Sequence, residues 1–216
     1  MTAKFWLAIA GILITCLIVV AIVVKSDAKS DHIVDSGHVV STDRCNEYIP
    51  TVRQQHWKYF GLEYPYWYGV SQLQVESGCR PDITSFDEGQ GIAQFMRNTE
   101  EGVERDLGEE LNMYNPDQAI RAQAFYMHQL HQQNWTGKLW LTYCFYNSGY
   151  GTMRKEYLRA GSSDYAKMKN NCRRNVIVLS SGTTLDLCEV GYSYPIKIDK
   201  KAIPYRLFDD KNWKFW

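Results

Sequence analysis

Residues 68–99 have the sequence YGVSQLQVESGCRPDITSFDEGQGIAQFMRNT, which begins as an apolar helical pattern and breaks at a glycine. Glu76 and Ser77 stand at the end of that pattern, and Gly78 and Pro81 are residues that stop helices. A carboxylate at the C-terminal end of a helix meets the partial negative charge of the helix dipole, which raises its pKa. Apolar neighbours act in the same direction. The stretch therefore predicts a glutamate with an elevated pKa at a helix end.

An elevated pKa is what a proton donor needs near neutral pH. At an ordinary pKa near 4.3, about one Glu in 500 is protonated at neutral pH. Raising the pKa by roughly two units costs about 2.7 kcal/mol and makes the acid form abundant. Glu76 is therefore a candidate general acid, while a solvated glutamate without a catalytic role is the commoner alternative.

Other polar and glycine residues follow Glu76 at defined spacings. Pro81 comes five positions after it and Ser85 nine positions after it, and Gly91-Ile92-Ala93-Gln94 follows. A second apolar helical segment ends in Tyr146-Asn147-Ser148-Gly149. Two ordered motifs at this separation are more specific than a lone Glu-Ser pair.

With these motifs the chain resembles the soluble lytic transglycosylases, relatives of goose-type lysozyme, over residues 45–170. The resemblance implies a mainly α, lysozyme-like catalytic domain. Two positions depart from the family pattern: Glu88-Gly89 stands where the family usually has Gly-Ala, and Ala93 replaces the usual Met. These departures fall in the part of the groove near the cleaved bond and add acidic side chains there.

The resemblance also implies a reaction on peptidoglycan glycan strands. Glu76 would protonate the oxygen that joins N-acetylmuramic acid to N-acetylglucosamine. It would then act as a base on the C6 hydroxyl, which closes a 1,6-anhydro ring without admitting water. The substrate-binding candidates are the matching polar and aromatic side chains Ser85, Gln94, Tyr146, Asn147 and Ser77. For the two serines, capping or turn hydrogen bonds are the alternative role, and Ser77 in particular fits support of the loop after the helix.

Two other functions stay open on the sequence. In a hydrolytic muramidase, Asp87 or Glu88 would position a water as the second carboxylate. Alternatively, the domain binds glycan without cleaving it, as a component of a secretion, conjugation or phage assembly. No cofactor is expected. His128 and His131 lie three residues apart on a predicted helix, but no third metal ligand accompanies them, so no metal site is predicted.

The N-terminus predicts a membrane anchor. Residues 5–24, FWLAIAGILITCLIVVAIVV, carry no charge and match a hydrocarbon core of roughly 30 Å as a helix. We expect a transmembrane anchor over residues 1–25 and a polar linker over 26–42. The flanking lysines do not decide its orientation, but the implied substrate lies outside the inner membrane. The expected location is therefore a single-pass inner-membrane protein with its domain in the periplasm, or a virion membrane if the chain is phage-encoded.

The rest of the chain predicts helices followed by a short β-containing extension. Predicted helices cover residues 66–77, 138–146 and 152–160, and further helices begin after Thr99, Asn115 and Ser163-Asp164. The pattern over residues 175–187 predicts two strands with a Ser-Gly turn, and residues 194–198, YPIKI, predict another strand. The domain boundaries follow as a catalytic domain at 43–171 and an extension at 172–216.

Charge and cysteine content limit the class of protein further. Lys+Arg and Asp+Glu both number 24, so the net charge is zero, which argues against a general nucleic-acid binder. Cys16 lies in the predicted anchor, and five other cysteines follow it. Five thiols in an oxidising compartment fit two bridges and one free cysteine, with Cys172–Cys188 the best candidate pair; buried reduced cysteines are the alternative.

Overall fold

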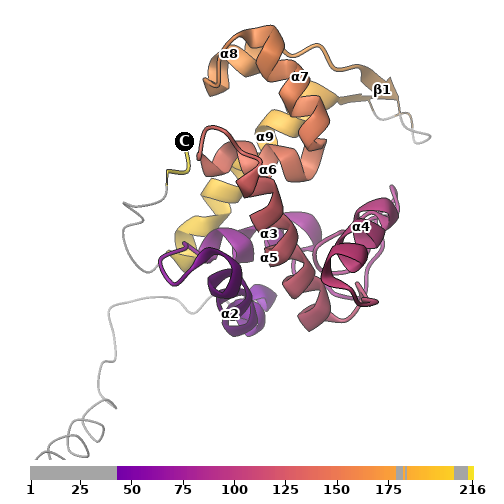
Figure 1. Ribbon diagram of the computed structural model, residues 1–216. Helices are drawn as coiled ribbons and strands as arrows, with labels where there is room; N and C mark the ends of the chain where they lie inside the picture. Colours follow the sequence, from indigo (N-terminus) through magenta and orange to yellow (C-terminus); the bar gives the residue numbers. More distant parts are fainter. Residues whose placement is uncertain (1–42, 179–181, 183, 207–213) are drawn as a thin grey trace, which may run out of the picture. The chain divides into compact units, whose positions relative to one another are not determined.

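Helices make up most of the fold in the computed structural model (Figure 1), which describes residues 43–178, 182, 184–206 and 214–216. The predicted anchor and linker, residues 1–42, lie outside the described residues. Within the described part of the chain, no helix combines the length and apolar character that a bilayer crossing requires. The elements are η1 Arg44–Tyr48, α2 Ile49–Phe60, α3 Trp67–Ser77, α4 Arg97–Leu107, α5 Pro116–Gln132, α6 Leu139–Ser148, α7 Tyr150–Ala160, α8 Tyr165–Asn170, β1 Val176–Val178, β2 Thr184–Asp186, α9 Leu187–Ala202 and η2 Ile203–Tyr205.

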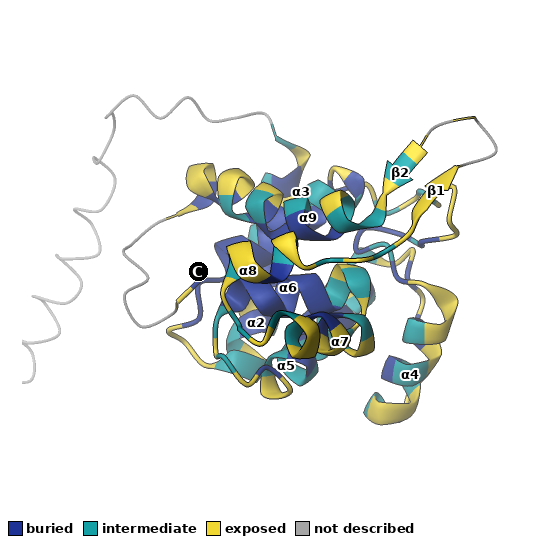
Figure 2. Cartoon of the chain, turned by 90° about the horizontal axis from the view of Figure 1, so that it is seen from above, coloured by how far each residue is buried: buried dark blue, intermediate teal, exposed yellow. Residues whose placement is uncertain are grey.

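The core forms around α6, which is buried along most of its length. Every residue from Leu139 to Phe145 is buried, as a helix that is apolar on all sides requires. α5, α7 and α9 pack against α6, and α9 also packs along α3. Figure 2 shows the buried residues of α3, α6 and α9 at the centre of the fold. The two helices that carry the predicted motifs therefore belong to the close-packed core of the molecule.

Most predicted helix ends are confirmed, and one is wrong. Asn115 caps α5 by accepting from the backbone N–H groups of Asp117 and Gln118, and Gly78 ends α3 in the left-handed conformation with φ 64°. Thr99, however, does not cap α4, because the helix already begins at Arg97. Met96 occupies the cap position, and the Arg97–Glu101 ion pair at 3.0 Å supports the first turn in place of a capping side chain.

The extension begins with the predicted strand pair and a disulfide. β1 and β2 are antiparallel, with Ile177 opposite Leu185. The predicted Cys172–Cys188 bridge is confirmed, a second bridge joins Cys45 to Cys79, and Cys144 is buried and free. The expectation of two bridges and one free cysteine outside the anchor is therefore confirmed.

The predicted strand at residues 194–198 is wrong, because this segment lies inside α9. The buried residues Gly191, Tyr194, Pro195, Ile198 and Ala202 follow a helical spacing and face α3 and α6. Pro195 cannot donate to the carbonyl four residues before it, and the thiol of Cys144 donates to that Gly191 oxygen at 3.7 Å. Tertiary packing thus overrides the β-type alternation of YPIKI.

The described end of the tail completes the N-terminus of α6. The backbone N–H of Leu139 donates a hydrogen bond to the carbonyl of Lys214 at 2.9 Å, and that of Trp140 donates to the carbonyl of Phe215 at 2.8 Å. These N–H groups have no partner within their own helix, so the tail acts as a cap. The buried ring of Phe215 lies between Tyr68 and Tyr143, which anchors the tail to the core.

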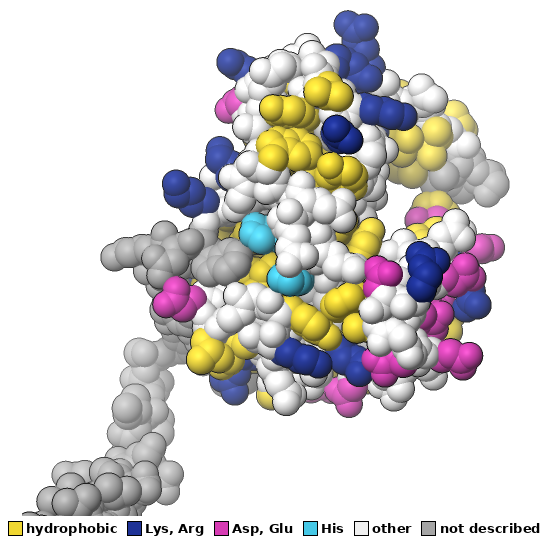
Figure 3. Space-filling model, viewed as in Figure 1, with side chains coloured by type: hydrophobic (Ala, Val, Ile, Leu, Met, Phe, Trp, Pro, Cys, Tyr) yellow, Lys and Arg dark blue, Asp and Glu magenta, His cyan; other side chains and the backbone are white. Residues whose placement is uncertain are grey.

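Charged side chains are distributed unevenly over the surface of the described part of the chain. Figure 3 shows Lys and Arg over the end formed by α7 and α8, and Asp and Glu gathered around α4. The aromatic side chains at the start of α3 do not reach the surface, because Tyr64, Tyr66, Trp67 and Tyr68 are all buried. Their role in the structure is core packing.

Candidate active site

Glu76 lies in the last turn of α3, where the sequence predicts it. Its side chain is half-buried, and burial raises the pKa of Glu76 from 4.5 to about 7. The negative charge of Asp87 acts in the same direction, whereas a hydrogen bond from Tyr194 lowers the pKa. Burial is the largest cause, and it brings the pKa of Glu76 close to neutral pH.

Tyr194 is a functional candidate that the sequence reasoning missed. Its hydroxyl donates a hydrogen bond to Oε1 of Glu76, and its side chain is buried. The pKa of Tyr194 is well above its ordinary value because of burial and the neighbouring Glu76 charge, so the phenol keeps its proton. Because the sequence pattern predicts a strand over residues 194–198, it does not identify Tyr194 as a site residue. The helical spacing of Gly191, Tyr194 and Ile198 is the signal that could have placed it on the face toward α3.

Ser77 supports the loop that follows α3. Its hydroxyl donates to the carbonyl of Ile92 at 2.8 Å and accepts from the backbone N–H of Arg80 at 3.1 Å. Ser77 is buried and does not line the cleft beside Glu76. Ser77 therefore supports the loop and does not line the cleft, which is the alternative role that the sequence predicts.

The loop itself is shaped by hydrogen bonds around Ser85 and Gln94. The Ser85 hydroxyl accepts from the backbone N–H of Gly89 at 2.8 Å and donates to Asp87 at 2.5 Å. Gln94 has a left-handed backbone with φ 55°, and its Nε2 donates to the Gly91 carbonyl at 2.8 Å. These bonds fix both side chains at the cleft surface.

Gly91 is required where it stands. Its φ is +66°, and a Cβ atom there would lie 1.8 Å from the carbonyl oxygen of Met113. No larger residue fits without moving the backbone around Met113. The Gly of the Gly-Ile-Ala-Gln motif thus allows the loop to pack closely enough to bring Gln94 to the cleft.

The second motif lies at the end of α6, where Tyr146 and Asn147 line the cleft. The Tyr146 hydroxyl donates to the carbonyl of Ala93 at 2.8 Å, which joins the two motifs directly. Burial and the nearby Glu76 charge raise the pKa of Tyr146 well above its ordinary value, so its phenol stays neutral. Asn147 is exposed and lines the cleft, and its Oδ1 accepts a hydrogen bond from the Ser148 hydroxyl at 3.2 Å.

These elements enclose a cleft of about 230 Å³. Five of the six predicted site residues line it, and Ser77 does not. Asp87 also lines the cleft, whereas Glu88 is not among the lining residues. The cleft is lined by Glu76, Ser85, Asp87, Gly89, Gln94, Met96, Tyr146 and Asn147.

The histidines considered as metal ligands have other partners. His131 Nδ1 lies 3.0 Å from the hydroxyl of Thr142, and His128 Nε2 lies 3.4 Å from the amide of Gln132. Burial lowers the pKa of both histidines. Among the residues that the structure describes, no group of three or more His, Cys, Asp or Glu side chains has the arrangement of a metal site.

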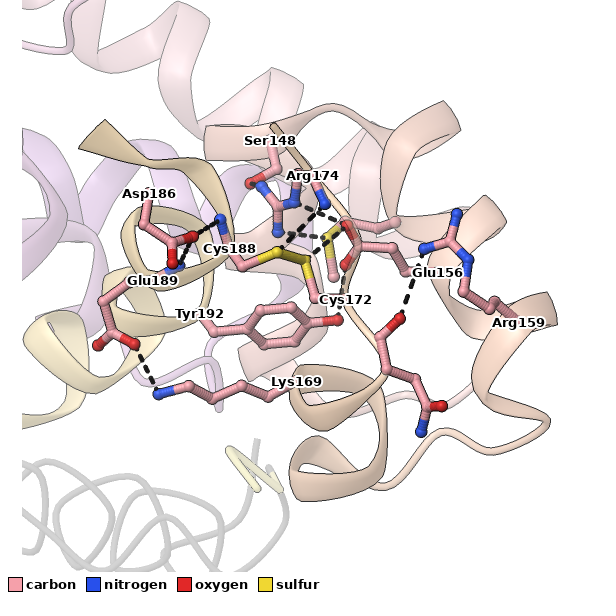
Figure 4. The surroundings of a disulfide bond; sticks show 12 residues. Ser148, Glu156, Arg159, Lys169, Cys172, Arg174, Asp186, Cys188, Glu189 and Tyr192 are labelled. Atoms are coloured by element: carbon pink, nitrogen blue, oxygen red, sulfur yellow. Dashed lines mark hydrogen bonds and ion pairs between the residues drawn. A yellow bond between two sulfur atoms is a disulfide. The ribbon is translucent and has the colours of Figure 1, made fainter. Parts of the chain in front are cut away.

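Beside the cleft, Arg174 holds the extension against α7 (Figure 4). It forms an ion pair with buried Glu156 at 2.7 Å and donates to the hydroxyl of Ser148 at 2.7 Å. Tyr192 donates to the other Glu156 oxygen at 2.7 Å. A Cβ atom on Gly191 would lie 2.4 Å from the guanidinium, so the absence of a side chain there makes room for Arg174.

Comparisons with solved structures show which proteins share this fold. The 70-kDa soluble lytic transglycosylase of Escherichia coli matches with a TM-score of 0.54 and 18% identity over 74% of this chain and 25% of that one. A complex of the 70-kDa soluble lytic transglycosylase with bulgecin A matches with a TM-score of 0.55 and 18% identity. That match covers 78% of this chain and 28% of the chain in the complex. The likeness therefore shows a common fold, and this chain spans about a quarter of the length of those structures.

Among curated proteins, no sequence matches the chain. The family described as the transglycosylase SLT domain matches residues 58–169. That range holds both motifs, Glu76-Ser77 and Tyr146-Asn147. The chain belongs to the transglycosylase SLT domain family.

Proposed function

We propose that this protein is a peptidoglycan lytic transglycosylase that cleaves the β-1,4 bond between N-acetylmuramic acid and N-acetylglucosamine. The observation that carries the proposal is the Glu76 carboxyl with a pKa of about 7 in a cleft lined by both family motifs. At that pKa the acid and the base forms are both populated at neutral pH. One carboxyl group can therefore serve two successive proton transfers.

The proposed reaction needs no second carboxylate and no water. Glu76 donates its proton to the glycosidic oxygen as the bond from C1 to that oxygen breaks, which leaves positive charge on the muramic acid ring. The Glu76 carboxylate then takes the proton of the C6 hydroxyl while the C6 oxygen bonds to C1. The product is a 1,6-anhydro sugar, and Glu76 returns to its protonated form.

The surrounding residues have distinct proposed roles. Gln94 and Ser85 hold the sugar by hydrogen bonds, including one to an acetamido group, and Asn147 lines the same cleft. The neutral phenols of Tyr146 and Tyr194 lie near the reacting carboxyl without adding charge. Tyr194 acts as a positioning residue, because its hydrogen bond fixes the orientation of Glu76.

The location that we propose follows from the substrate. Peptidoglycan lies outside the inner membrane, and the uncharged residues 5–24 have the length of a membrane anchor. The two disulfides support an oxidising compartment. We therefore propose a single-pass inner-membrane protein with residues 43–216 in the periplasm, acting alone or within an envelope-spanning or virion assembly.

Product analysis tests the proposed reaction. The full chain should release 1,6-anhydro muropeptides from purified sacculi, and Glu76→Gln should lower turnover by about a thousandfold or more while the circular dichroism spectrum stays unchanged. The amide keeps the size of the side chain but cannot donate or accept the proton. Unaltered turnover in Glu76→Gln would favour a glycan-binding component without catalysis.

A hydrolytic muramidase is the second candidate, and the structure favours Asp87 over Glu88 for it. Asp87 lines the cleft, and its charge acts on Glu76. In this mechanism Asp87 would position a water, and the product would carry a reducing end. Mass spectrometry separates the two products because they differ by one water. Loss of activity in Asp87→Asn as complete as in Glu76→Gln, with a reducing-end product, would select hydrolysis.

A further inference from the structure

One segment of the chain is strongly basic. Residues 150–174, which include α7 and α8, carry seven Lys and Arg but only two Asp and Glu, although the whole chain has no net charge. Residues 97–110, which include α4, carry six Asp and Glu and two Lys and Arg. The domain therefore has a positive end at α7 and α8 and a negative end at α4, as Figure 3 shows.

The solvent side of α7 carries much of this positive charge. Arg154, Lys155 and Arg159 are exposed, and no acid among the described residues forms an ion pair with any of them. The acid of the same helix, Glu156, is 2% exposed and pairs with Arg174. The cations on the solvent side of α7 are therefore not neutralised by the described part of the chain.

Apolar side chains lie among these cations. Leu158 is 67% exposed and follows Arg154 by four residues, so the two share a face of the helix. Trp135, in the turn after α5, is 41% exposed, and its ring centroid lies 4.7 Å from that of Tyr157 on α7. Figure 3 shows hydrophobic side chains bordered by Lys and Arg at the end of the molecule where Figure 1 shows α7. The surface that we call the α7 face consists of Trp135, Arg154, Lys155, Leu158 and Arg159.

This combination of side chains suits an anionic lipid surface. Trp is enriched where lipid headgroups meet the acyl chains, and Lys and Arg beside it are attracted to the charge of anionic headgroups. An anionic polymer in water would also match the cations, but it would leave Leu158 in contact with water. A bilayer removes the apolar side chains from water and pairs the cations at the same time.

The length of the chain before the described domain allows this contact. Eighteen residues, 25–42, separate the proposed anchor from Asp43, the first described residue. A segment of that length spans at most about 60 Å. A domain of the size of residues 43–216 is roughly 40 Å across. With residues 5–24 as an anchor, the α7 face can therefore reach the bilayer, and it stays at a high local concentration beside it.

We propose that the α7 face docks on the headgroups of an anionic phospholipid bilayer. The inference goes beyond the proposed reaction and takes from the proposed function only the anchor that keeps the domain near the membrane. The cations of the face contact lipid phosphates, while Leu158 and Trp135 enter between the headgroups. Because α7 begins three residues after Asn147, which lines the cleft, docking also sets how the cleft faces the bilayer.

Chemical labelling of lysines tests the docking in the full chain. The chain is mixed with an excess of lipid nanodiscs, made of phosphatidylcholine alone or with phosphatidylglycerol, and its lysines are acetylated by a water-soluble reagent. Peptide mass spectrometry then gives the rate at each lysine. Lys155 should react at least about fivefold more slowly on the anionic discs at low salt, and this protection should disappear at about 0.5 M salt.

Lys58, an exposed lysine on α2, is the internal control and should react at the same rate on both kinds of disc. Equal rates for Lys155 on the neutral and the anionic discs at low salt would overturn the inference.

Two variants of similar exposure locate the contact. Leu158→Glu places a carboxylate on the α7 face and should abolish the protection of Lys155. Leu62→Glu changes a leucine that is 73% exposed outside this face, and it should leave the protection unchanged. Protection that survives Leu158→Glu, or that is lost equally in both variants, would contradict docking through the α7 face.

The outcome is separable from that of the proposed function. Binding to the phosphatidylcholine discs reports the anchor, so a chain that binds only anionic discs and protects Lys155 there would dock without one. Glu76→Gln should dock as the intact chain does, so a failure to form 1,6-anhydro products leaves this inference standing. Protection of Lys155 by purified sacculi but not by anionic discs would identify a wall polymer as the partner and overturn the lipid inference.

Discussion

Two regions of the molecule meet at Glu76, and the chain builds them in different ways. The motif region, residues 67–96 and 139–149, contributes Glu76, Gln94 and Tyr146 through short sequence motifs. The C-terminal region, described over 172–178 and 184–202, contributes Tyr194 through helix packing, a disulfide and the Arg174–Glu156 pair. The comparison teaches that local motifs supply the side chains that line the cleft, while long-range contacts orient the Glu76 carboxyl among them.

The largest effect on stability is expected at the ion pair between Arg174 of the C-terminal region and buried Glu156 of α7. Arg174→Met leaves Glu156, which is 2% exposed, without its cation, and should lower the free energy of unfolding by about 3–5 kcal/mol. Urea denaturation measures this. The exposed neighbour in Arg173→Met is the matched control and should change stability by less than about 0.5 kcal/mol. Equal, small losses in both variants would show that the pair does not hold the region.

The two disulfides should stabilise their regions to different extents. The Cys45–Cys79 bridge spans 34 residues and the Cys172–Cys188 bridge spans 16. From the entropy of the unfolded chain, replacing the first pair with alanine should cost about 4 kcal/mol, and replacing the second about 3 kcal/mol. Parallel urea titrations of the two double variants measure the difference. A larger loss for the Cys172–Cys188 pair would mean that the C-terminal region carries the greater share of stability.

The half-buried Glu76 carboxyl of the motif region should make stability depend on pH. Because the folded-state pKa of Glu76 is about 7 and the ordinary value is 4.5, the folded state holds a proton that the unfolded state releases. This contribution is fully present below pH 4.5 and is lost as the pH rises to 7. Relative to Glu76→Gln, the intact chain should therefore lose about 3 kcal/mol of unfolding free energy between pH 4 and pH 8. A difference between the two chains that stays constant with pH would contradict a raised pKa.

The smallest expected effect tests the contact between the two regions. Tyr194→Phe removes a hydrogen bond to the charged form of Glu76, so the pKa of Glu76 should rise further. We expect kcat to fall by about tenfold and the alkaline limb of the pH profile to move to higher pH.

Tyr192→Phe is the matched control for that change. Its hydroxyl lies on the same helix but donates to Glu156, so this variant should lose stability and keep the position of the alkaline limb. If both variants give the same pH profile, Tyr194 has only a structural role.

The motif region was predictable from the sequence because its signals are local. Gly78 ends α3 beside Glu76, and Gly149 ends α6 two residues after Asn147. Tyr194 was not predictable from its segment, because YPIKI alternates as a strand does and contains a proline. Its helical conformation depends on the packing of α9 against α3 and α6, and on Cys144, which bonds the carbonyl that Pro195 leaves free. Such contacts join residues that are far apart in sequence.

The most direct measurement is the titration of the Glu76 carboxyl itself. Carbon-13 NMR of the full chain labelled at glutamate side chains, compared with Glu76→Gln, identifies its signal and follows it with pH. The account predicts a midpoint near pH 7, where burial places the pKa. A midpoint near the ordinary value of 4.5 would contradict the claim that this residue is held ready to donate a proton at neutral pH.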